Sequence, residues 1–598
     1  MSYNTPGQYI TENSNVNKPI QGSSQGIAAF IGICQFGPLN TATLVSSFAD
    51  FVSKFGSYIS TSYLAYAVEV FFKEAGEGAS CYITRVVHYT DITDLSTCTA
   101  ISAYVTLRDS LGAAALVATS TIEETAGNSY RVSISDATIP TAHGNFTDVG
   151  NKIVVINFSK AMKATTLIQG YFSSAAGGTI TAFVKDASNE FVTITFTNAL
   201  TAGDTVVMTA AVTDNETVPN PLPVAYRIAT KGTALDRTFK VEVFLVDTSV
   251  AINSLDNVTN DDMDDTTLAT VLFTSSANLR PVNIVKAVLA SGSTGVASMA
   301  DADYIGSVIT GTGLYSLDLI EEDLNIVIPG ITTRPVILAA SDYAEAKKSF
   351  YIGDIPSGLT YAEAKTFKLA TGTYVGSIAI DSAFCALYYP WYYIKDPTIA
   401  NTTKLMPVSA AMAGVYSRTA FLRGVHKAPA GVEDGKLKTA LGVERIVSDT
   451  QQGDLNPIGV NVIRSFSGFG VVAWGARTTS TDEDWKYINV RLHFNYIISS
   501  IINGTKWSVF EPNNKSLWSK LSLFCNSFLK KEFLKGAFAD GASGVPSESY
   551  YVICNSSNNT VTTVAAGQYH ISIGLAESKP GEFLICNISQ WDGGKVVT

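Results

Sequence analysis

The stretch LNIVIPGITTRPVILAASDYAEAKKSFYIGDI, residues 324–355, predicts the fold of the region around it. Its first six residues form a continuous apolar run, and a helical pattern follows from Pro335 to about Lys348. A second strand is expected over Phe350–Ile355. Continuous apolar runs predict strands that are buried on both faces, and a helix between two such strands predicts a parallel crossover. The stretch therefore predicts a strand–helix–strand unit of a parallel α/β sheet.

Strand and helix patterns continue to alternate on both sides of this unit. The further predicted elements are a strand over 26–34, helices over 48–55 and 63–75, a strand over 81–87, a helix over 361–369 and a strand over 383–389. Ser60 or Thr61 is the expected N-cap of the second helix. This order of elements is typical of a multidomain α/β protein.

The C-terminal part predicts a separate α+β domain built from helices and a sheet. Residues 484–503 and 514–535 carry apolar side chains at helical spacing, and Gly536 is expected to end the second helix. Three strands are expected over 550–554, 569–575 and 582–588. The chain therefore combines an α/β region with a C-terminal helix-and-sheet domain.

Length and composition limit the function classes. The chain has 598 residues, which suggests about three to five domains. Its net charge of −11 argues against a protein that binds nucleic acid directly. Charged residues make up 16% of the chain, against about 25% in ordinary soluble proteins, so we expect neighbouring subunits to cover much of the surface. No secretory signal or membrane-spanning run is evident, so we expect a cytosolic product without membrane insertion.

The region over residues 96–310 is rich in Thr, Ser, Ala and Val and has short strand patterns. Residues 150–215 show alternating and β-branched runs separated by turns, which is typical of a β-sandwich. Phe158–Met162 and Leu200–Asp204 resemble short sequence segments of bacterial Ig-like domains. We therefore expect an inserted all-β, Ig-like domain at about 140–225.

The sequence offers no convincing catalytic or metal-binding group. Gly22–Gly26 matches GxSxG, but a strand follows the serine where a nucleophile elbow needs a helix. Gly468–Ala473 matches a loose GxGxxA, but β-forming residues on both sides favour a hairpin. The acidic run Asp261–Asp265 lacks the glycine and final glutamate of an EF-hand loop, and the five histidines are dispersed. The seven cysteines are expected to be reduced. We therefore expect no enzyme, cofactor or metal site.

Both ends of the chain carry short extended patches outside the predicted domains. Such patches can add a strand to the sheet of another chain, and the resulting head-to-tail contacts generate rings or helical filaments. The candidate residues for strand addition are Gly7, Gln8, Tyr9, Ile10 and Thr11 near the N-terminus and Trp591, Lys595, Val596 and Val597 near the C-terminus.

Three lysines lie along the second long C-terminal helix. Lys520 and Lys531 are eleven residues apart and share one face, and Lys535 continues it one turn later. The row is either a solvated edge of the helix or a docking stripe for an acidic partner. Both interpretations stay open on the sequence.

Several segments occur together in the order found in one family. They are PGQYITE (6–12), AAFIGICQFGPLN (28–40), SSFADFVSKFG (46–56), GLYSLDLIEEDLNIVIPG (313–330), YYPWYYIKDP (388–397), RGVHKAPAG (423–431) and WGARTTSTDEDWKYINVRLHFNYIISSIINGTKWSVFEPNN (474–514). In these segments the chain resembles the tail sheath proteins of contractile phages and of related contractile injection systems. The resemblance covers residues 5–95 and about 300–590, and the β-rich insert departs from it.

The resemblance implies a structural subunit of a contractile tail sheath. Subunits would form six-membered rings stacked helically around an inner tail tube, with arms that add strands to the C-terminal sheets of neighbours. Contraction would drive the tube through a target cell envelope. Baseplate and tail terminator proteins would be further partners. The assembly would be a virion tail or an injection particle, built in the host cytoplasm.

The resemblance also implies a layout of the chain. The expected parts are an N-terminal arm (1–22), the N-terminal part of the sheath core (23–95), a variable outer region (96–310), an α/β sheath domain (311–425), a tube-facing C-terminal domain (426–583) and a C-terminal arm (584–598). The lysines at 520, 531 and 535 are then candidates for tube contact. The alternative function is an extracellular Ig-like adhesin or surface-layer protein, which would require secretion.

Overall fold

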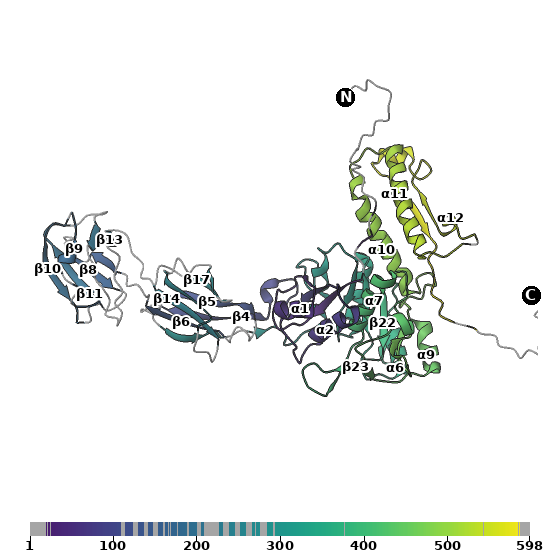
Figure 1. The fold of residues 1–598 in the computed structure, drawn as a ribbon, viewed down its shortest axis with the longest axis horizontal. Coiled ribbons are helices and arrows are strands. Elements are labelled where there is room, and N and C mark those ends of the chain that lie inside the picture. Colours follow the sequence, from purple (N-terminus) through teal and green to yellow (C-terminus); the bar gives the residue numbers. More distant parts are fainter. Residues whose placement is uncertain are drawn as a thin grey trace, which may run out of the picture. The chain divides into compact units, whose positions relative to one another are not determined.

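The computed structural model describes residues 26–108 and 293–583 apart from residues 376 and 542. It also describes Ile20, Gly22, Ser23, Ile585 and a series of strands and short connections between residues 114 and 290. The chain divides into two compact units (Figure 1). Residues 1–86, 91–95 and 299–598 form the first unit, and residues 87–90 and 96–298 form the second. The predicted strand-forming residues of both arms and the acidic run 261–265 lie outside the described residues.

An eight-stranded sheet forms the centre of the first unit, in the order β2–β3–β1–β20–β21–β22–β26–β27. The six inner strands are parallel, and the two outer strands pair antiparallel with their neighbours. The strands are β1 (Ile27–Gly32), β2 (Thr43–Val45), β3 (Cys81–Arg85), β20 (Leu324–Val327), β21 (Phe350–Asp354), β22 (Cys385–Tyr389), β26 (Val460–Phe466) and β27 (Gly470–Ala473). The predicted parallel α/β sheet is therefore confirmed, with β1 lying between β3 and β20.

Helices connect these strands and cover both faces of the sheet. They include α1 (Phe48–Phe55), α2 (Leu64–Ala75), α4 (Asp301–Ile305), α5 (Arg334–Lys347), α6 (Tyr361–Leu369), α7 (Ser409–Arg423), α8 (Gly431–Asp434) and α9 (Asp449–Leu455). The predicted cap of α2 is wrong. Tyr63 holds the N-cap position, and the Ser62 hydroxyl accepts a hydrogen bond from the Leu64 amide at 3.1 Å. The helix begins later than expected, so Ser60 and Thr61 lie before its N-cap.

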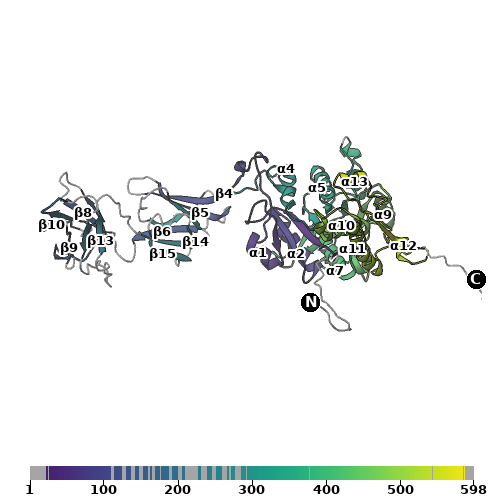
Figure 2. The same ribbon diagram turned by 90° about the horizontal axis from the view of Figure 1, so that it is seen from above.

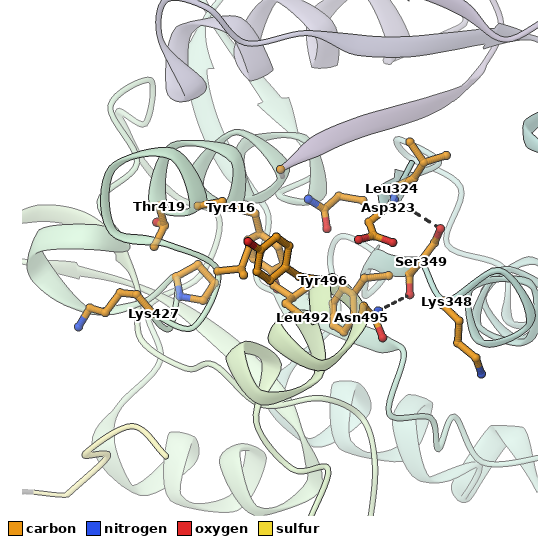
Figure 3. Close-up of a pocket in the computed structure, with 16 residues that line it drawn as sticks. Asp323, Leu324, Lys348, Ser349, Tyr416, Thr419, Lys427, Leu492, Asn495 and Tyr496 are labelled. Atoms are coloured by element: carbon orange, nitrogen blue, oxygen red, sulfur yellow. Dashed lines mark hydrogen bonds between the residues drawn. The ribbon is translucent and has the colours of Figure 1, made fainter. Parts of the chain in front are cut away.

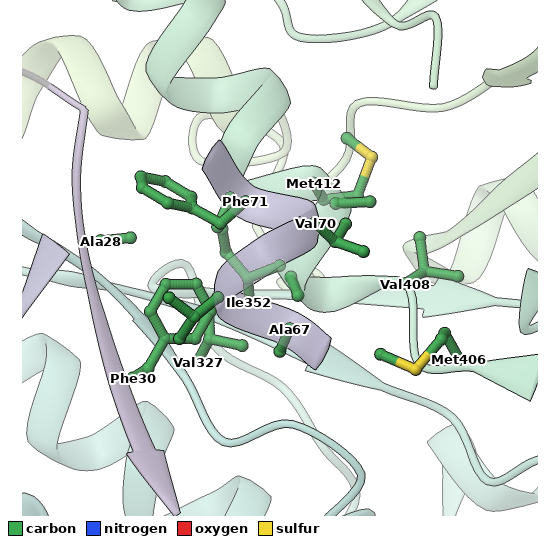
Figure 4. Close-up of a cluster of buried hydrophobic side chains, with 14 of the residues drawn as sticks. Ala28, Phe30, Ala67, Val70, Phe71, Val327, Ile352, Met406, Val408 and Met412 are labelled. Carbon is green, nitrogen blue, oxygen red and sulfur yellow. The ribbon is translucent and has the colours of Figure 1, made fainter. Parts of the chain in front are cut away.

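Side chains from alternate positions of the strands enter two separate cores. On β1, Ala28 and Phe30 face the core that contains α2 and α7, which Figure 4 shows in part. Ala29 and Ile31 face the opposite core, which contains α5 and α6. A strand with helices on both faces needs apolar residues at every position, which explains the continuous apolar runs in the sequence.

The last part of the first unit is a helix-and-sheet domain. It contains α10 (Ile488–Thr505), α11 (Lys515–Leu534), α12 (Pro546–Ser549), β28 (Tyr550–Ile553), α13 (Val561–Ala565) and β29 (Ser572–Leu575). Helices α10 and α11 lie side by side (Figures 1 and 2) and pack through the rings of Tyr496 and Phe528, whose centroids are 6.0 Å apart. The two long predicted helices are confirmed. The predicted strand over 582–588 is wrong at its start, because Glu582 and Phe583 are not in a strand.

The second unit consists of antiparallel strands in two groups. One group contains sheets β10–β11–β8–β7 and β13–β12–β9, whose residues share a core that includes Ile156, Phe196 and Val206. Their bounds are β7 (Ala142–Phe146), β8 (Ile153–Phe158), β9 (Phe172–Ser173), β10 (Ile180–Lys185), β11 (Phe191–Phe196), β12 (Thr205–Met208) and β13 (Tyr226–Thr230). These strands fall where a β-rich insert was expected. Their assignment as an Ig-like domain stays a prediction.

The other group has its own core, which includes Leu116, Val241 and Phe273. Its strands are β4 (Ala100–Arg108), β5 (Ala114–Glu123), β6 (Tyr130–Asp136), β14 (Phe239–Leu245), β15 (Asn253–Val258), β16 (Thr266–Leu268), β17 (Val271–Ser275), β18 (Ile284–Val288) and β19 (Ser293–Thr294). At the border of the unit, the His88 amide donates a hydrogen bond to the Gly295 carbonyl at 2.7 Å. The first and last segments of the unit therefore lie next to each other in space.

We predict that Phe71→Ala destabilises the unassembled subunit by about 3–5 kcal/mol, because Phe71 is fully buried against Phe30 at 5.4 Å between ring centroids. Phe421→Ala is the matched control, since this ring is 84% exposed and its loss should change stability by less than about 0.5 kcal/mol. Urea unfolding measures both. Equal effects of the two substitutions would contradict the packing described here.

Candidate functional site

The segments near both ends of the described chain are hydrogen-bonded to helix α10. We call Ile20, Gly22 and Ser23 the N-terminal root and residues 576–583 the C-terminal root. If the terminal segments bind neighbouring subunits, as the sequence suggests, these two roots carry the mechanical load. They are therefore the candidate functional site.

The N-terminal root lies along α10. The Ile20 side chain is buried and lies so close to Gly504 that a Cβ at that position would be 2.7 Å from it. The Ser23 amide donates to the Ser500 hydroxyl at 2.9 Å, and the Ser23 hydroxyl donates to Asp323 at 3.1 Å. The root is thus held by shape at one point and by hydrogen bonds at two others.

Asp323 joins the N-terminal root to the α/β core. Its carboxylate accepts hydrogen bonds from the hydroxyls of Ser23 and Ser499, and no described cation forms an ion pair with it. Burial raises the pKa of Asp323 to about 6, although the two serine hydrogen bonds act in the opposite direction. The charged form of this carboxyl group is therefore poorly stabilised where it lies.

The seam between α10 and the α/β core lies next to Asp323 (Figure 3). Asn495 donates to the Ser349 carbonyl at 3.1 Å, and the Leu324 amide donates to the Ser349 hydroxyl at 3.4 Å. The cavity in this seam measures about 40 Å³, which accommodates water but no substrate. The seam is therefore a polar joint between two parts of the unit.

The C-terminal root is held by Glu582. Its carboxylate accepts from Arg477 at 2.8 and 2.5 Å, from Asn456 at 2.6 Å and from the Tyr487 hydroxyl at 3.3 Å. Burial tends to raise the pKa of Glu582, but hydrogen bonds from Arg477 and Asn456 outweigh it and leave the pKa lowered. A bidentate arginine fixes both position and orientation, so the chain leaves the domain in a defined direction.

A buried charged cluster lies beneath the C-terminal root. His493 of α10 is fully buried, with Nδ1 2.6 Å from Glu577 and Nε2 3.9 Å from Glu532. Lys535 contacts Glu532 at 2.8 Å. Burial tends to lower the pKa of His493, but hydrogen bonds to Glu532 and Glu577 and their charges raise it overall. The cluster thus ties α10, α11 and the segment after β29 together.

The lysine row lies on α11 as predicted, but its members differ. Lys520 and Lys531 are exposed on one face, which also carries Leu523 (66% exposed) and Leu534 (74% exposed). In the described part of the chain, no ion pair involves Lys520 or Lys531. Lys535 instead holds Glu532 of the buried cluster. The face is therefore a mixed stripe of two unpaired cations and two exposed leucines.

Among the described residues, strands β28 and β29 form a two-stranded sheet. Tyr550 and Val552 contribute to the core beneath it, whereas Tyr551 is 56% and Ile553 is 38% exposed. A two-stranded sheet leaves the outer edge of each strand available for a further strand. Whether residues 7–11 and 591–597 fill these edges stays a prediction, because these residues lie outside the described part.

Of the weak chemistry motifs, the GxGxxA match lies wholly within the described residues. Residues 468–473 form the turn and second strand of the β26–β27 hairpin, with φ of +84° at both Gly468 and Gly470, so the predicted hairpin is confirmed. No group of three or more His, Cys, Asp or Glu side chains with metal-binding geometry occurs among the described residues. In the same residues, no helix is both long and apolar enough to cross a bilayer.

Residues 336–479 match the family described as phage tail sheath protein central domain. The chain is 24% identical over 223 residues to the tail sheath protein of Enterobacteria phage T4, which covers 37% of this chain and 32% of that protein. It is 26% identical over 191 residues to the tail sheath protein of Vibrio phage KVP40, covering 31% and 27%. In these residues the chain is similar to contractile tail sheath proteins. It spans about a third of the length of these curated relatives.

Two solved sheath structures share the fold of this chain. The helical sheath of the anti-feeding prophage in its contracted state aligns with a TM-score of 0.50 at 18% identity, over 98% of this chain and 100% of that chain. The sheath tail protein of Listeria innocua aligns with a TM-score of 0.52 at 10% identity, over 90% of both chains. The α/β sheath-like fold is therefore confirmed, and the adhesin alternative is not favoured.

We predict that Asp323→Asn reduces the pH dependence of stability of the unassembled subunit. The folded chain holds the Asp323 proton more tightly than the unfolded chain, so the wild type loses stability as pH rises through about 6. The amide cannot ionise, so the variant should gain on the order of 1–2 kcal/mol relative to wild type at about pH 8.

Thermal unfolding at about pH 5 and pH 8 measures this difference. Asp342→Asn, at an exposed position of α5, is the matched control and should leave the pH dependence unchanged. The same pH dependence in wild type and Asp323→Asn would refute the assignment.

Proposed function

We propose that the chain is a structural subunit of a contractile tail sheath, which polymerises helically around an inner tube and contracts to drive the tube through a target cell envelope. The observation that carries this proposal is the family match over residues 336–479, which lie on the central sheet of the first unit. The proposed role is structural, without catalysis. The proposed partners are further copies in six-membered rings, the inner tube, and baseplate and tail terminator proteins. The proposed place of action is a virion tail or injection particle assembled in the host cytoplasm.

Strand addition is the proposed link between subunits. The arms over 1–22 and 584–598 would each add a strand to the β28–β29 sheet of a neighbour, which has two available edges. Backbone hydrogen bonds give such contacts strength that does not depend on side-chain packing. The links would therefore persist while the bodies of the subunits rotate. The firm attachment of both roots to α10 and to Arg477 supports this role.

The α11 face is the proposed contact with the tube. Lys520 and Lys531 would face acidic groups, and Leu523 and Leu534 would add a small apolar contribution. Exposed ion pairs contribute only about 0–1 kcal/mol each, so a contact of this kind releases readily. Lys535 has a supporting role in this scheme because it is engaged with Glu532.

The second unit is proposed as the variable outer region, with an Ig-like insert at about 140–225. Its cores are built from its own residues, so it does not depend on the central sheet for burial of its apolar side chains. Contraction itself would follow from a kinetically trapped extended assembly that relaxes to a better-packed one.

We predict that deletion of residues 1–22 abolishes formation of long sheath-like assemblies. The chain is co-expressed with its tube protein and the assemblies are then purified. The deletion removes one strand donor together with Ile20 and Gly22 of the N-terminal root, so rings lose their connections to each other. Negative-stain electron microscopy measures the length of the assemblies that this chain forms. Unlinked subunits or short rings are expected, and normal tubes from the truncated chain would rule out the arm as a link.

We predict that Lys520→Glu combined with Lys531→Glu weakens co-assembly with the tube at least about tenfold at physiological salt, because two attractive charges become repulsive. Lys515→Glu is the matched control, since it is exposed on the same helix about 140° away. Co-sedimentation with preformed tubes measures the effect. Equal co-sedimentation of the double variant and the control would refute this assignment of the tube-facing surface.

A further inference from the structure

A groove of about 650 Å³ opens beside the C-terminal root. It lies between the loop that follows α7, helix α9, the β26–β27 hairpin and residues 578–583. Its lining includes His426, Lys427, Arg464, Trp474, Lys579 and Phe583. The groove is large enough for several side chains of a peptide, unlike the cavity beneath Asp323.

Aromatic groups are left exposed around this groove. The Trp474 ring packs edge-on against Phe466 at 4.9 Å but remains 40% exposed, and Phe583 is 73% exposed. Ile585 follows and is 82% exposed. Apolar side chains gathered at one place on a surface usually mark a contact with another segment or molecule.

The charges in the groove favour a segment with an acidic group. Asp449 is engaged by Arg464 at 2.5 Å, and Glu582 is engaged by Arg477. The acidic groups of the lining are thus neutralised within the chain. Among the described residues, no ion pair involves Lys579. A carboxylate that enters the groove would therefore meet an unpaired cation.

The C-terminal segment of the same chain, residues 586–598, starts at this groove and has the matching chemistry. Its sequence CNISQWDGGKVVT places Trp591 directly before Asp592. Trp591 lies six positions after Ile585, a distance along the chain that can span up to about 20 Å. A segment tethered this closely has an effective concentration on the order of millimolar, so even weak affinity for the groove fills it.

We propose that, in the unassembled subunit, residues 586–598 dock in the groove of their own chain. Trp591 lies against Trp474 and Phe583, and Asp592 faces Lys579. This occupant is favoured over a second copy because the tether makes the intramolecular contact independent of protein concentration.

The docked segment would regulate assembly. This consequence rests on the proposed sheath function, in which residues 591–597 add a strand to a neighbour. A segment held in its own groove is not available to a neighbouring sheet, so subunits would remain separate until assembly offers a stronger contact. The docking itself does not require that function and is tested separately.

Hydrogen–deuterium exchange of the full chain, measured by mass spectrometry, tests the docking. Trp591→Ala should accelerate exchange in peptides covering 426–431 and 470–476 by about tenfold, because the groove loses its tethered occupant. Lys579→Glu should act in the same direction. Val561→Ala, at an 88% exposed position outside the groove lining, is the matched control and should leave exchange in these peptides unchanged. The protection in wild type should not depend on protein concentration.

Two outcomes would overturn the proposal. Equal exchange in wild type and Trp591→Ala would show that the segment does not cover the groove. Protection that rises with protein concentration would show that a second copy covers it. Sheath formation with unprotected groove peptides would refute docking and leave the proposed function standing. Protected groove peptides without sheath formation on the tube would refute the function and leave docking standing.

Discussion

The fold depends on the pairing of β1 with both β3 and β20. These three strands are the second, third and fourth of the eight-stranded sheet, yet the whole second unit lies in the sequence between β3 and β20. The two cores on either side of the sheet each draw side chains from β1 and from the strands after residue 324. The entropy of closing a long loop grows only slowly with its length, so the sheet tolerates a large insertion at this point.

The two roots are fastened by different physical means. The N-terminal root is held by close packing of Ile20 against Gly504 and by hydrogen bonds that Ser23 donates to Ser500 and Asp323. A charged, bidentate pair holds the C-terminal root, through Arg477 and Glu582. Both roots converge on α10, which also contributes His493 to the cluster that joins it to α11. Helix α10 is thus the common support for any load that the terminal segments carry.

The sequence predicted the helices and strands that are determined by the pattern of neighbouring residues. Periodicity placed helix α1 at Phe48–Phe55 with Gly56 after it, and uninterrupted apolar runs placed the parallel strands. The contacts that define the candidate site were missed. Arg477 and Glu582 are 105 positions apart, and His493 and Glu577 are 84 positions apart, so no spacing rule links them. The strand predicted over 582–588 is wrong at its start, where Glu582 is held by side chains from distant segments and not by strand pairing.

The hydrogen bond between His88 and Gly295 has a consequence for how such chains diversify. Residues near the two ends of the second unit are hydrogen-bonded to each other, so the sequence between them forms one module. Exchange of that module would leave the pairing of β1 untouched. Different sequences could therefore occupy this module while the strand pairings of the central sheet stay the same.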